Sequence, residues 1–195
     1  LSLPELGTYI LELNGANGIA VLNHPLYFSS TLPVLPDFAD MREPRNENQS
    51  LSLNREKAIW LRMINQARAQ QQLSKVNLDT ELSAFAQNYA EQMAKENFFG
   101  HVDPLGNDPD KRRQLANLPM PVGENLARDY DTKYAHAGLL RSAAHRLNIM
   151  AQEWGRVGLG IAEDSQGNWL FVQEFSASML SADDLSATRN DLLNL

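Results

Sequence analysis

The sequence contains no cysteine, no long apolar run and no excess of basic residues. Without cysteine the chain cannot form a disulfide framework, a CxxC redox pair or a cysteine-rich zinc site. No apolar run approaches the roughly 20 residues that a membrane-spanning helix requires, so we expect no transmembrane segment. The net charge of −7 and the pI near 5.1 argue against a nucleic-acid-binding surface, which needs clustered lysine and arginine. A solvated loop explains the one basic cluster, Lys111-Arg112-Arg113.

The residues that are present are sufficient for one hydrophobic core. The chain has 195 residues, of which 43% are hydrophobic. This length favours a domain of roughly 100–150 residues with an appendage. The sequence starts at Leu1 rather than at methionine, as a processed protein or an excised fragment does, so we expect that any signal peptide has already been removed.

Residues 1–36 form a β-rich segment with two strand-like runs, TYILEL (8–13) and GIAVLN (18–23). The turn sequence NGAN between these runs is typical of a hairpin. Residues 37–53 are polar and charged without periodicity, which indicates a linker. The β-rich segment is too short to be stable alone. It therefore either pairs with the rest of the chain or is the end of a preceding domain, and we favour the second interpretation.

We expect the main domain at residues 54–180, followed by a tail at 181–195. Helical spacing of apolar residues predicts a first helix over 54–72. After Asp79, a candidate N-cap, apolar residues keep the i, i+3, i+4, i+7 pattern through four turns up to Ala94. The apolar residues of this second helix are predicted to belong to the core.

The pattern then changes from helix to strand. A weaker helical stretch spans about 132–146, and two alternating runs at 156–162 and 168–175 predict strands. The sequence EDSQG between them is a hairpin turn. Helices followed by a hairpin indicate an α+β domain with an antiparallel sheet.

Three polar residues stand where an apolar residue would be structurally easier: His101, Glu124 and His145. We expect Gly100 to end the second helix in a left-handed conformation, which leaves His101 as the first residue beyond it. No HExxH pair is present, so the residue pattern alone favours hydrogen-bonded or surface histidines over a metal site. Ser142 and His145 would share a helix face as hydroxyl and base. No GxSxG elbow accompanies them, so a serine nucleophile is a weaker alternative.

Six short motifs, taken together, resemble those of a known family. In chain order they are MINQAR, FFGHVDPLG, GEN, SAAHRLNI, WGRVGLGIA and FVQEF. Over residues 55–177 the chain resembles the SCP-like extracellular domain, the bacterial branch of the CAP superfamily. That superfamily groups cysteine-rich secretory proteins, insect venom antigens and plant pathogenesis-related proteins. The disulfides of eukaryotic relatives are missing here, which fits a bacterial source.

The resemblance implies a three-layer α-β-α sandwich, secretion, and a central cleft where two histidines and two acidic residues meet. It identifies His101 and His145 as the cleft histidines and Glu124 as the glutamate of the GEN motif. Where many eukaryotic members have a second glutamate, this chain offers Ser142, which we expect in the cleft. A divalent metal such as zinc is associated with this cleft. We expect His101, His145 and Glu124 to bind it weakly, because one carboxylate is lost.

Two kinds of function remain open at this point. The first is an exported binding module, extracellular, periplasmic or at the cell surface, that captures a lipid, a glycan or an envelope protein. The second is a metal-dependent hydrolase, a peptidase or a nuclease, whose catalytic candidates are the same His101, Glu124 and His145, with Glu124 accepting a proton from a metal-bound water. Nuclease action conflicts with the acidic charge. We favour binding.

Overall fold

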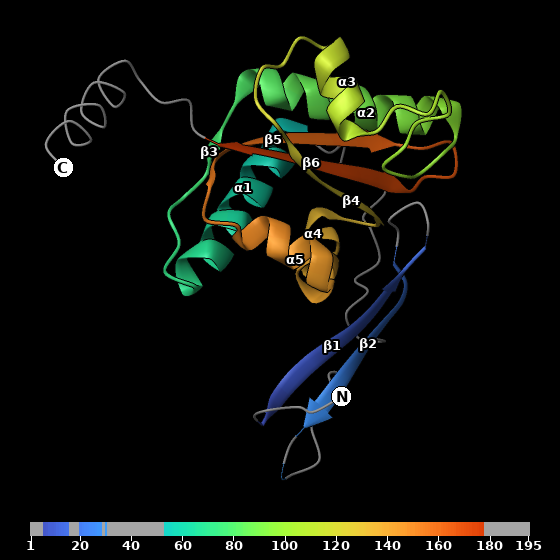
Figure 1. The fold of residues 1–195 in the computed structure, drawn as a ribbon. Coiled ribbons are helices and arrows are strands. Elements are labelled where there is room, and N and C mark those ends of the chain that lie inside the picture. The colour runs from blue at the N-terminus through green and yellow to red at the C-terminus, as the bar shows by residue number, and fades with distance from the viewer. Residues whose placement is uncertain (1–5, 16–19, 29, 31–52, 178–195) are drawn as a thin grey trace, which may run out of the picture.

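The computed structural model describes residues 6–15, 20–28, 30 and 53–177. The expected linker at 37–53, apart from Leu53, and the expected tail at 181–195 lie outside these ranges. The described residues form two separate sheets, a two-stranded hairpin and a four-stranded sheet (Figure 1). Of the helices that these residues form, none combines the length and the hydropathy needed to span a bilayer.

The four-stranded sheet is the middle layer of the main domain. Its strands, in spatial order, are β3 (Asn77–Leu78), β5 (Trp154–Glu163), β6 (Trp169–Ala177) and β4 (Gly123–Asp129). β4, β6 and β5 are antiparallel neighbours as expected, whereas the short β3 pairs in parallel with β5. β4 is therefore an edge strand.

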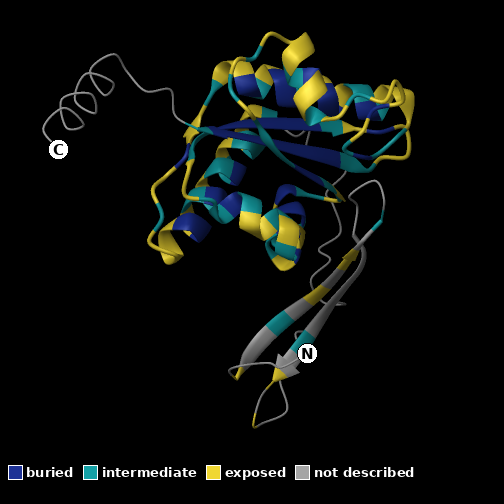
Figure 2. Ribbon diagram, in the orientation of Figure 1, coloured by how far each residue is buried: buried dark blue, intermediate teal, exposed yellow. Residues whose placement is uncertain are grey.

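Helices cover both faces of this sheet (Figure 1). One face carries α2 (Thr80–Glu96) and α3 (Pro109–Leu115), and the other carries α1 (Leu53–Gln70), α4 (Thr132–Arg141) and α5 (Ala143–Met150). The expected α+β architecture, a three-layer α-β-α sandwich, is confirmed. Figure 2 shows that the central strands are buried along most of their length.

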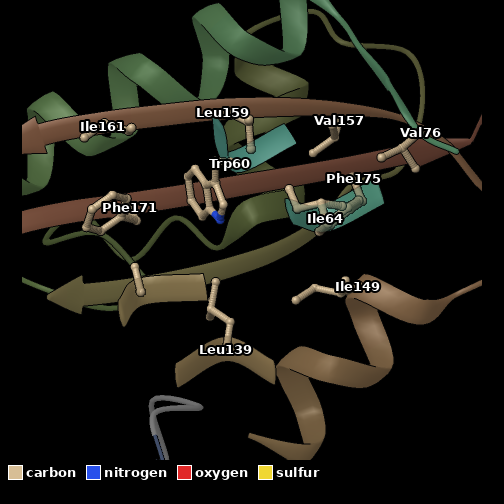
Figure 3. Packing of buried hydrophobic residues seen from close by; sticks show 11 residues of the cluster. Trp60, Ile64, Val76, Leu139, Ile149, Val157, Leu159, Ile161, Phe171 and Phe175 are labelled. Carbon is tan, nitrogen blue, oxygen red and sulfur yellow. The ribbon is translucent and has the colours of Figure 1, made fainter. Parts of the chain in front are cut away.

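The alternation of side chains in β5 and β6 creates two apolar cores, one on each face of the sheet. The core under α1, α4 and α5 is drawn in Figure 3, and in it Trp60 meets Phe171 edge to face with ring centroids 5.3 Å apart. The core under α2 includes the helix residues Ala86, Tyr89 and Met93. The predicted apolar faces of both helices are thus confirmed as core, because each faces the sheet.

Two glycines of β5 allow α2 to approach the sheet closely. A Cβ atom at Gly158 would lie 2.1 Å from the carbonyl carbon of Leu82, and one at Gly160 would lie 2.1 Å from the carbonyl oxygen of Ala86. Both contacts are with helix backbone, which cannot move without shifting α2. Tight packing against α2 therefore explains why glycine occupies both positions.

The buried Arg68 joins α1 to the end of α5. Its guanidinium donates to the carbonyl oxygens of Ile149 at 2.7 Å and Ala151 at 2.8 Å, and its Nε donates to that of Ser74 at 2.8 Å. The carbonyls at a helix C-terminus lack intrahelical partners, so a fixed cation there both satisfies them and complements the helix dipole. Arg68 thereby holds in place the helix that carries His145.

Two expected helix boundaries are wrong. α2 ends at Glu96, and Asn97 rather than Gly100 takes the left-handed conformation, with φ of 54°. Asparagine tolerates this region because its short polar side chain can bond locally. The stretch 132–146 is not one helix, because Ser142 has extended dihedrals and separates α4 from α5.

The N-terminal hairpin consists of β1 (Gly7–Asn14) and β2 (Ala20–Phe28). Both expected strands are present, and β2 extends further than the sequence pattern predicts, through Pro25. Proline is compatible with an edge strand, and each strand of a two-stranded sheet has a free edge.

Candidate functional site

Two histidines from opposite helical layers approach each other across the edge strand β4. His101 lies in the loop after α2, and His145 lies on α5. Their ring centroids are 6.4 Å apart, and the planes are tilted by 32°. The structure therefore brings together two of the predicted cleft residues, which are 44 positions apart in the sequence.

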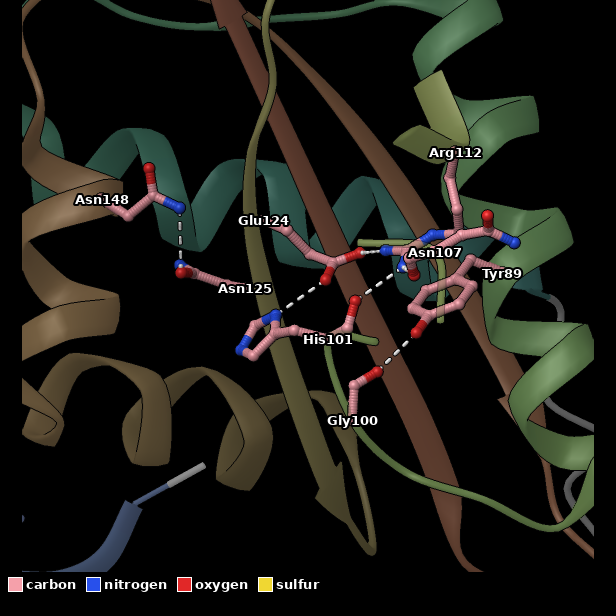
Figure 4. Close-up of polar contacts among 8 residues, drawn as sticks. All are labelled: Tyr89, Gly100, His101, Asn107, Arg112, Glu124, Asn125 and Asn148. Carbon is pink, nitrogen blue, oxygen red and sulfur yellow. Dashed lines mark hydrogen bonds and ion pairs between the residues drawn. The ribbon is translucent and has the colours of Figure 1, made fainter. Parts of the chain in front are cut away.

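Glu124 on β4 fixes the ring of His101. Its Oε1 lies 2.7 Å from Nδ1 of His101, as Figure 4 shows. The Glu124 side chain is 1% exposed and that of His101 is 20% exposed. A buried carboxylate accepts a hydrogen bond from Nδ1, so the neutral imidazole keeps its lone pair on Nε2. All three predicted residues, His101, Glu124 and His145, thus belong to one cluster.

Arg112 on α3 completes this cluster, and the sequence does not predict it there. Its guanidinium pairs with Oε2 of Glu124 and donates to the backbone carbonyl of His101 at 2.6 Å and to that of Asn107 at 3.1 Å. It also lies over the ring of Tyr89, with Cζ 3.4 Å from the ring centroid. Arg112 is buried, so the expectation of a solvated basic loop is wrong for this residue.

Local sequence explains why α3 places Arg112 there. Asp108 accepts from the N–H of Lys111 at 2.8 Å as N-cap, and Pro109 begins the helix. Before it, Asp103 accepts from the N–H of Leu105 and of Asn107, at 2.9 and 2.8 Å. The two Asp-Pro pairs of the sequence HVDPLGNDPD thus form a turn at Asp103 and a helix N-cap at Asp108.

Tyr89 ties the His101 loop to α2. Its hydroxyl donates to the carbonyl oxygen of Gly100 at 2.5 Å. Burial raises the pKa of Tyr89, although the charge of Arg112 opposes this effect, so the hydroxyl stays protonated and remains a donor. The loop is held from α2 by Tyr89 and from α3 by Arg112.

Glu174 lies directly beside Glu124 on the neighbouring strand β6. The two residues form a register pair, and Glu174 is fully buried. No N–H or hydroxyl group among the described residues donates to either of its oxygens. Burial, and then the adjacent charge of Glu124, raise the pKa of Glu174 well above its usual range, while Arg112 works against them. This shift favours the protonated form of Glu174, in which the carboxyl group can act as a hydrogen-bond donor toward Glu124.

Asn125 organises the other half of the cleft. Because side chains alternate along a strand, Asn125 points to the face opposite Glu124. Its Nδ2 donates to the carbonyl of His145 at 3.1 Å and to Oε1 of Gln173 at 2.9 Å, and its Oδ1 accepts from Nδ2 of Asn148 at 3.0 Å (Figure 4). Consecutive residues of the GEN motif thus hold the His101 loop and the His145 helix.

Ser142 is buried at the junction of α4 and α5, where it is the N-cap residue of α5. His145 follows it at the third position of α5. Its contribution to the cleft stays a prediction. His136, on α4, is buried too, and burial lowers its pKa to about 4.

The described residues do not provide a three-ligand metal site. Within residues 6–15, 20–28 and 53–177, no three histidine, aspartate or glutamate side chains gather in a way that could hold a metal ion. Glu124 has both oxygens engaged, one by His101 and one by Arg112, and the guanidinium would repel a divalent cation. Of the three predicted ligands, His101 and His145 lie outside this ion pair, and their binding of a metal stays a prediction.

The layered fold and the pair of histidines facing each other across β4 define an SCP-type domain. Residues 61–175, more than half of the chain, match the model of the cysteine-rich secretory protein family, CAP. The chain therefore belongs to the CAP family.

Several solved structures share this fold. An outer surface protein of Borrelia burgdorferi is similar with a TM-score of 0.61 at 18% identity, covering 66% of this chain and 97% of its own. An extracellular SCP-domain protein of Bacillus anthracis has a TM-score of 0.57 at 21% identity, over 67% of this chain and 45% of its own. A cysteine-rich secretory protein of Staphylococcus aureus has a TM-score of 0.55 at 13% identity, over 88% of this chain and 56% of its own. No curated protein sequence matches significantly.

Proposed function

We propose that this chain is an exported bacterial binding domain and that the cleft around His101 and His145 recognises a lipid, a glycan or a protein of the cell envelope. One observation supports binding over catalysis. Glu124 and Arg112 pair with each other inside the domain, so neither charged group is available for a reaction. The imidazoles of His101 and His145 lie outside this ion pair, and both residues are partly exposed. With Nδ1 bonded to Glu124, Nε2 of His101 can accept a hydrogen bond, which suits an uncharged partner with hydroxyl or amide groups.

The proposed location is extracellular, periplasmic or at the cell surface. Membership of the CAP family supports export. The Borrelia relative is described as an outer surface protein and the Bacillus relative as an extracellular protein. These descriptions apply to those proteins, and we extend them to this chain as part of the proposal.

We expect the full chain, purified after export from a bacterial host, to retain an envelope lipid or glycan. Organic and aqueous extracts of the protein would be analysed by mass spectrometry. The double variant His101→Gln, His145→Gln should lose about tenfold in affinity, which is the loss expected from two hydrogen bonds. His136→Gln is the matched control, because this histidine is buried away from solvent. Equal retention by all three proteins would contradict recognition by the cleft.

A metal-dependent hydrolase, a peptidase or nuclease, is the second candidate. One observation favours it: a carboxylate that accepts from Nδ1 orients an imidazole in the way that ligand and base histidines require. The role expected for Glu124 has less support. Its oxygens are engaged by His101 and Arg112, so it is poorly placed to accept a proton from water. Fragments of the extracted lipid or glycan, produced by the wild type and not by the double variant, would favour the hydrolase.

Zinc binding tests the metal part of the proposal. We expect weak binding, because two imidazoles without a carboxylate leave most of the coordination shell to water. Isothermal titration of zinc at pH 7.5 should give an affinity that falls at least about tenfold in His101→Gln and in His145→Gln. His136→Gln should match the wild type. One common affinity in all four proteins would exclude a shared site and leave the histidines as a hydrogen-bonded cluster.

A further inference from the structure

The CAP resemblance implies a divalent metal in a cleft whose carboxylate is already paired in this chain. The partner of that carboxylate is a guanidinium: Arg112 contacts Oε2 of Glu124 and, through a second nitrogen, the backbone carbonyl of His101 at 2.6 Å. We infer that Arg112 is the resident cation of this cleft and that its guanidinium excludes divalent metal from the carboxylates. Glu124 is then a positioning residue that acts through His101, and not a metal ligand.

The residues around Arg112 form a site suited to a guanidinium group. The guanidinium is buried and lies 3.4 Å from the centre of the Tyr89 ring, and Tyr89 itself is 2% exposed. A weakly hydrated planar cation is stable on an aromatic face, whereas a divalent ion needs oxygen or nitrogen ligands all around. The ring of Tyr89 therefore suits arginine and offers nothing to a metal ion.

The burial of Glu124 explains why a cation is required beside it. Glu124 and Glu174 are register neighbours, both almost completely buried, and no N–H or hydroxyl of the described residues donates to the oxygens of Glu174. The raised pKa of Glu174 favours its uncharged form, which needs no cation, whereas the carboxylate of Glu124 would carry the full cost of desolvation if it were unpaired. In this chain Arg112 is the cation that pairs with Glu124.

The contacts of Glu124 explain how Arg112 excludes a metal ion from this carboxylate. A divalent ion bound to Glu124 would have to displace Arg112 from Oε2 or His101 from Oε1, because these two contacts engage both oxygens. Displacing Arg112 would also break its bond to the His101 carbonyl, and with it one support of the loop that carries the imidazole. In a variant without the guanidinium, a metal ion would not have to displace Arg112, and Oε2 of Glu124 would be free to bind it.

The inference concerns the cleft of the proposed function but does not depend on the identity of its ligand. The test is calorimetric titration of zinc into the full chain and its Arg112→Ala variant. We expect the variant to bind zinc at least tenfold more tightly than the wild type. Methylguanidinium should compete with zinc in the variant and have no effect on the wild type, because it refills the place of the lost side chain.

Three further variants test whether the gain in zinc affinity depends on Arg112 and Glu124. Adding Glu124→Gln to Arg112→Ala should abolish the gain, because the freed oxygen is removed. Arg113→Ala should leave zinc affinity unchanged, since Arg113 bonds instead to Asp110 at 2.6 Å and to the carbonyl of Leu118 at 3.1 Å. If Arg112→Ala does not fold, Arg112→Gln keeps much of the side-chain volume without the charge and should show the same gain. Unchanged zinc affinity in the folded variant, or a gain that survives Glu124→Gln, would overturn the inference.

Discussion

Replacing Gly160 by alanine is expected to destabilise the domain by about 3 kcal/mol, enough to unfold a marginal protein. The added Cβ would lie 2.1 Å from the carbonyl oxygen of Ala86 and 2.3 Å from its carbon. These atoms belong to the backbone of α2, so the clash can be relieved only by moving the helix away from the sheet. Such a movement would open the core that contains Tyr89, whose hydroxyl holds the loop of His101.

Gly138→Ala is the matched control for this substitution. Gly138 lies within α4, and no atom lies within 4 Å of the position that its Cβ would take. Alanine in a helix interior is favoured over glycine by about 0.5–1 kcal/mol, so this variant should be slightly more stable than the wild type. Urea unfolding followed by circular dichroism measures both variants. A Gly160→Ala variant as stable as the wild type would mean that α2 and β5 are not in the tight contact described.

Glu174→Gln is expected to stabilise the protein at neutral pH, by an amount that increases with pH. Burial and the neighbouring Glu124 raise the pKa of Glu174 in the folded state. Above about pH 4.3 the unfolded chain releases this proton while the folded protein retains it, so rising pH favours unfolding of the wild type. The cost grows by up to about 1.4 kcal/mol per pH unit until the raised pKa is reached. Glutamine carries its donor permanently and avoids this cost.

The two proteins should therefore have similar stability near pH 4 and diverge as the pH rises to 8. Chemical unfolding at several pH values measures the difference. Glu163→Gln is the control, because it makes the same chemical change at an exposed position at the end of β5. Parallel pH profiles for the wild type and Glu174→Gln would show that Glu174 is already ionised in the folded protein, contrary to our interpretation of the carboxyl pair.

The sequence predicts the framework of the fold well because periodicity is a local property. Asp79 is predicted as an N-cap, and it accepts from the N–H of Leu82 at 2.9 Å. The alternation of Val157, Leu159 and Ile161 correctly predicts one buried face of a strand. Boundaries are less well predicted: Asn97 ends α2 and Ser142 interrupts the last helical stretch, because a single dihedral change leaves the apolar pattern almost unaltered.

The polar residues of the site differ in how well their burial can be predicted from the sequence. A signal for Glu174 is present, because FVQEF is a strand inside a sheet covered on both faces, so a glutamate there must be buried. Arg112 carries no such signal, since Lys111-Arg112-Arg113 has the composition of a solvated loop. It is buried only because α3 turns this one arginine toward Glu124 and Tyr89.

The sequence by itself determined the order and type of most elements, one apolar face of the sheet, and the three residues His101, Glu124 and His145 as candidates. Only the tertiary structure decided what surrounds them. Hydrophobic periodicity is a pattern among residues a few positions apart, so it can be recognised in the sequence alone. The pairing of Glu124 with Arg112 and Glu174 instead depends on strand register and on the docking of a short helix. These are long-range contacts, and they determine whether a carboxylate in the cleft is available to a metal ion or already neutralised by the chain itself.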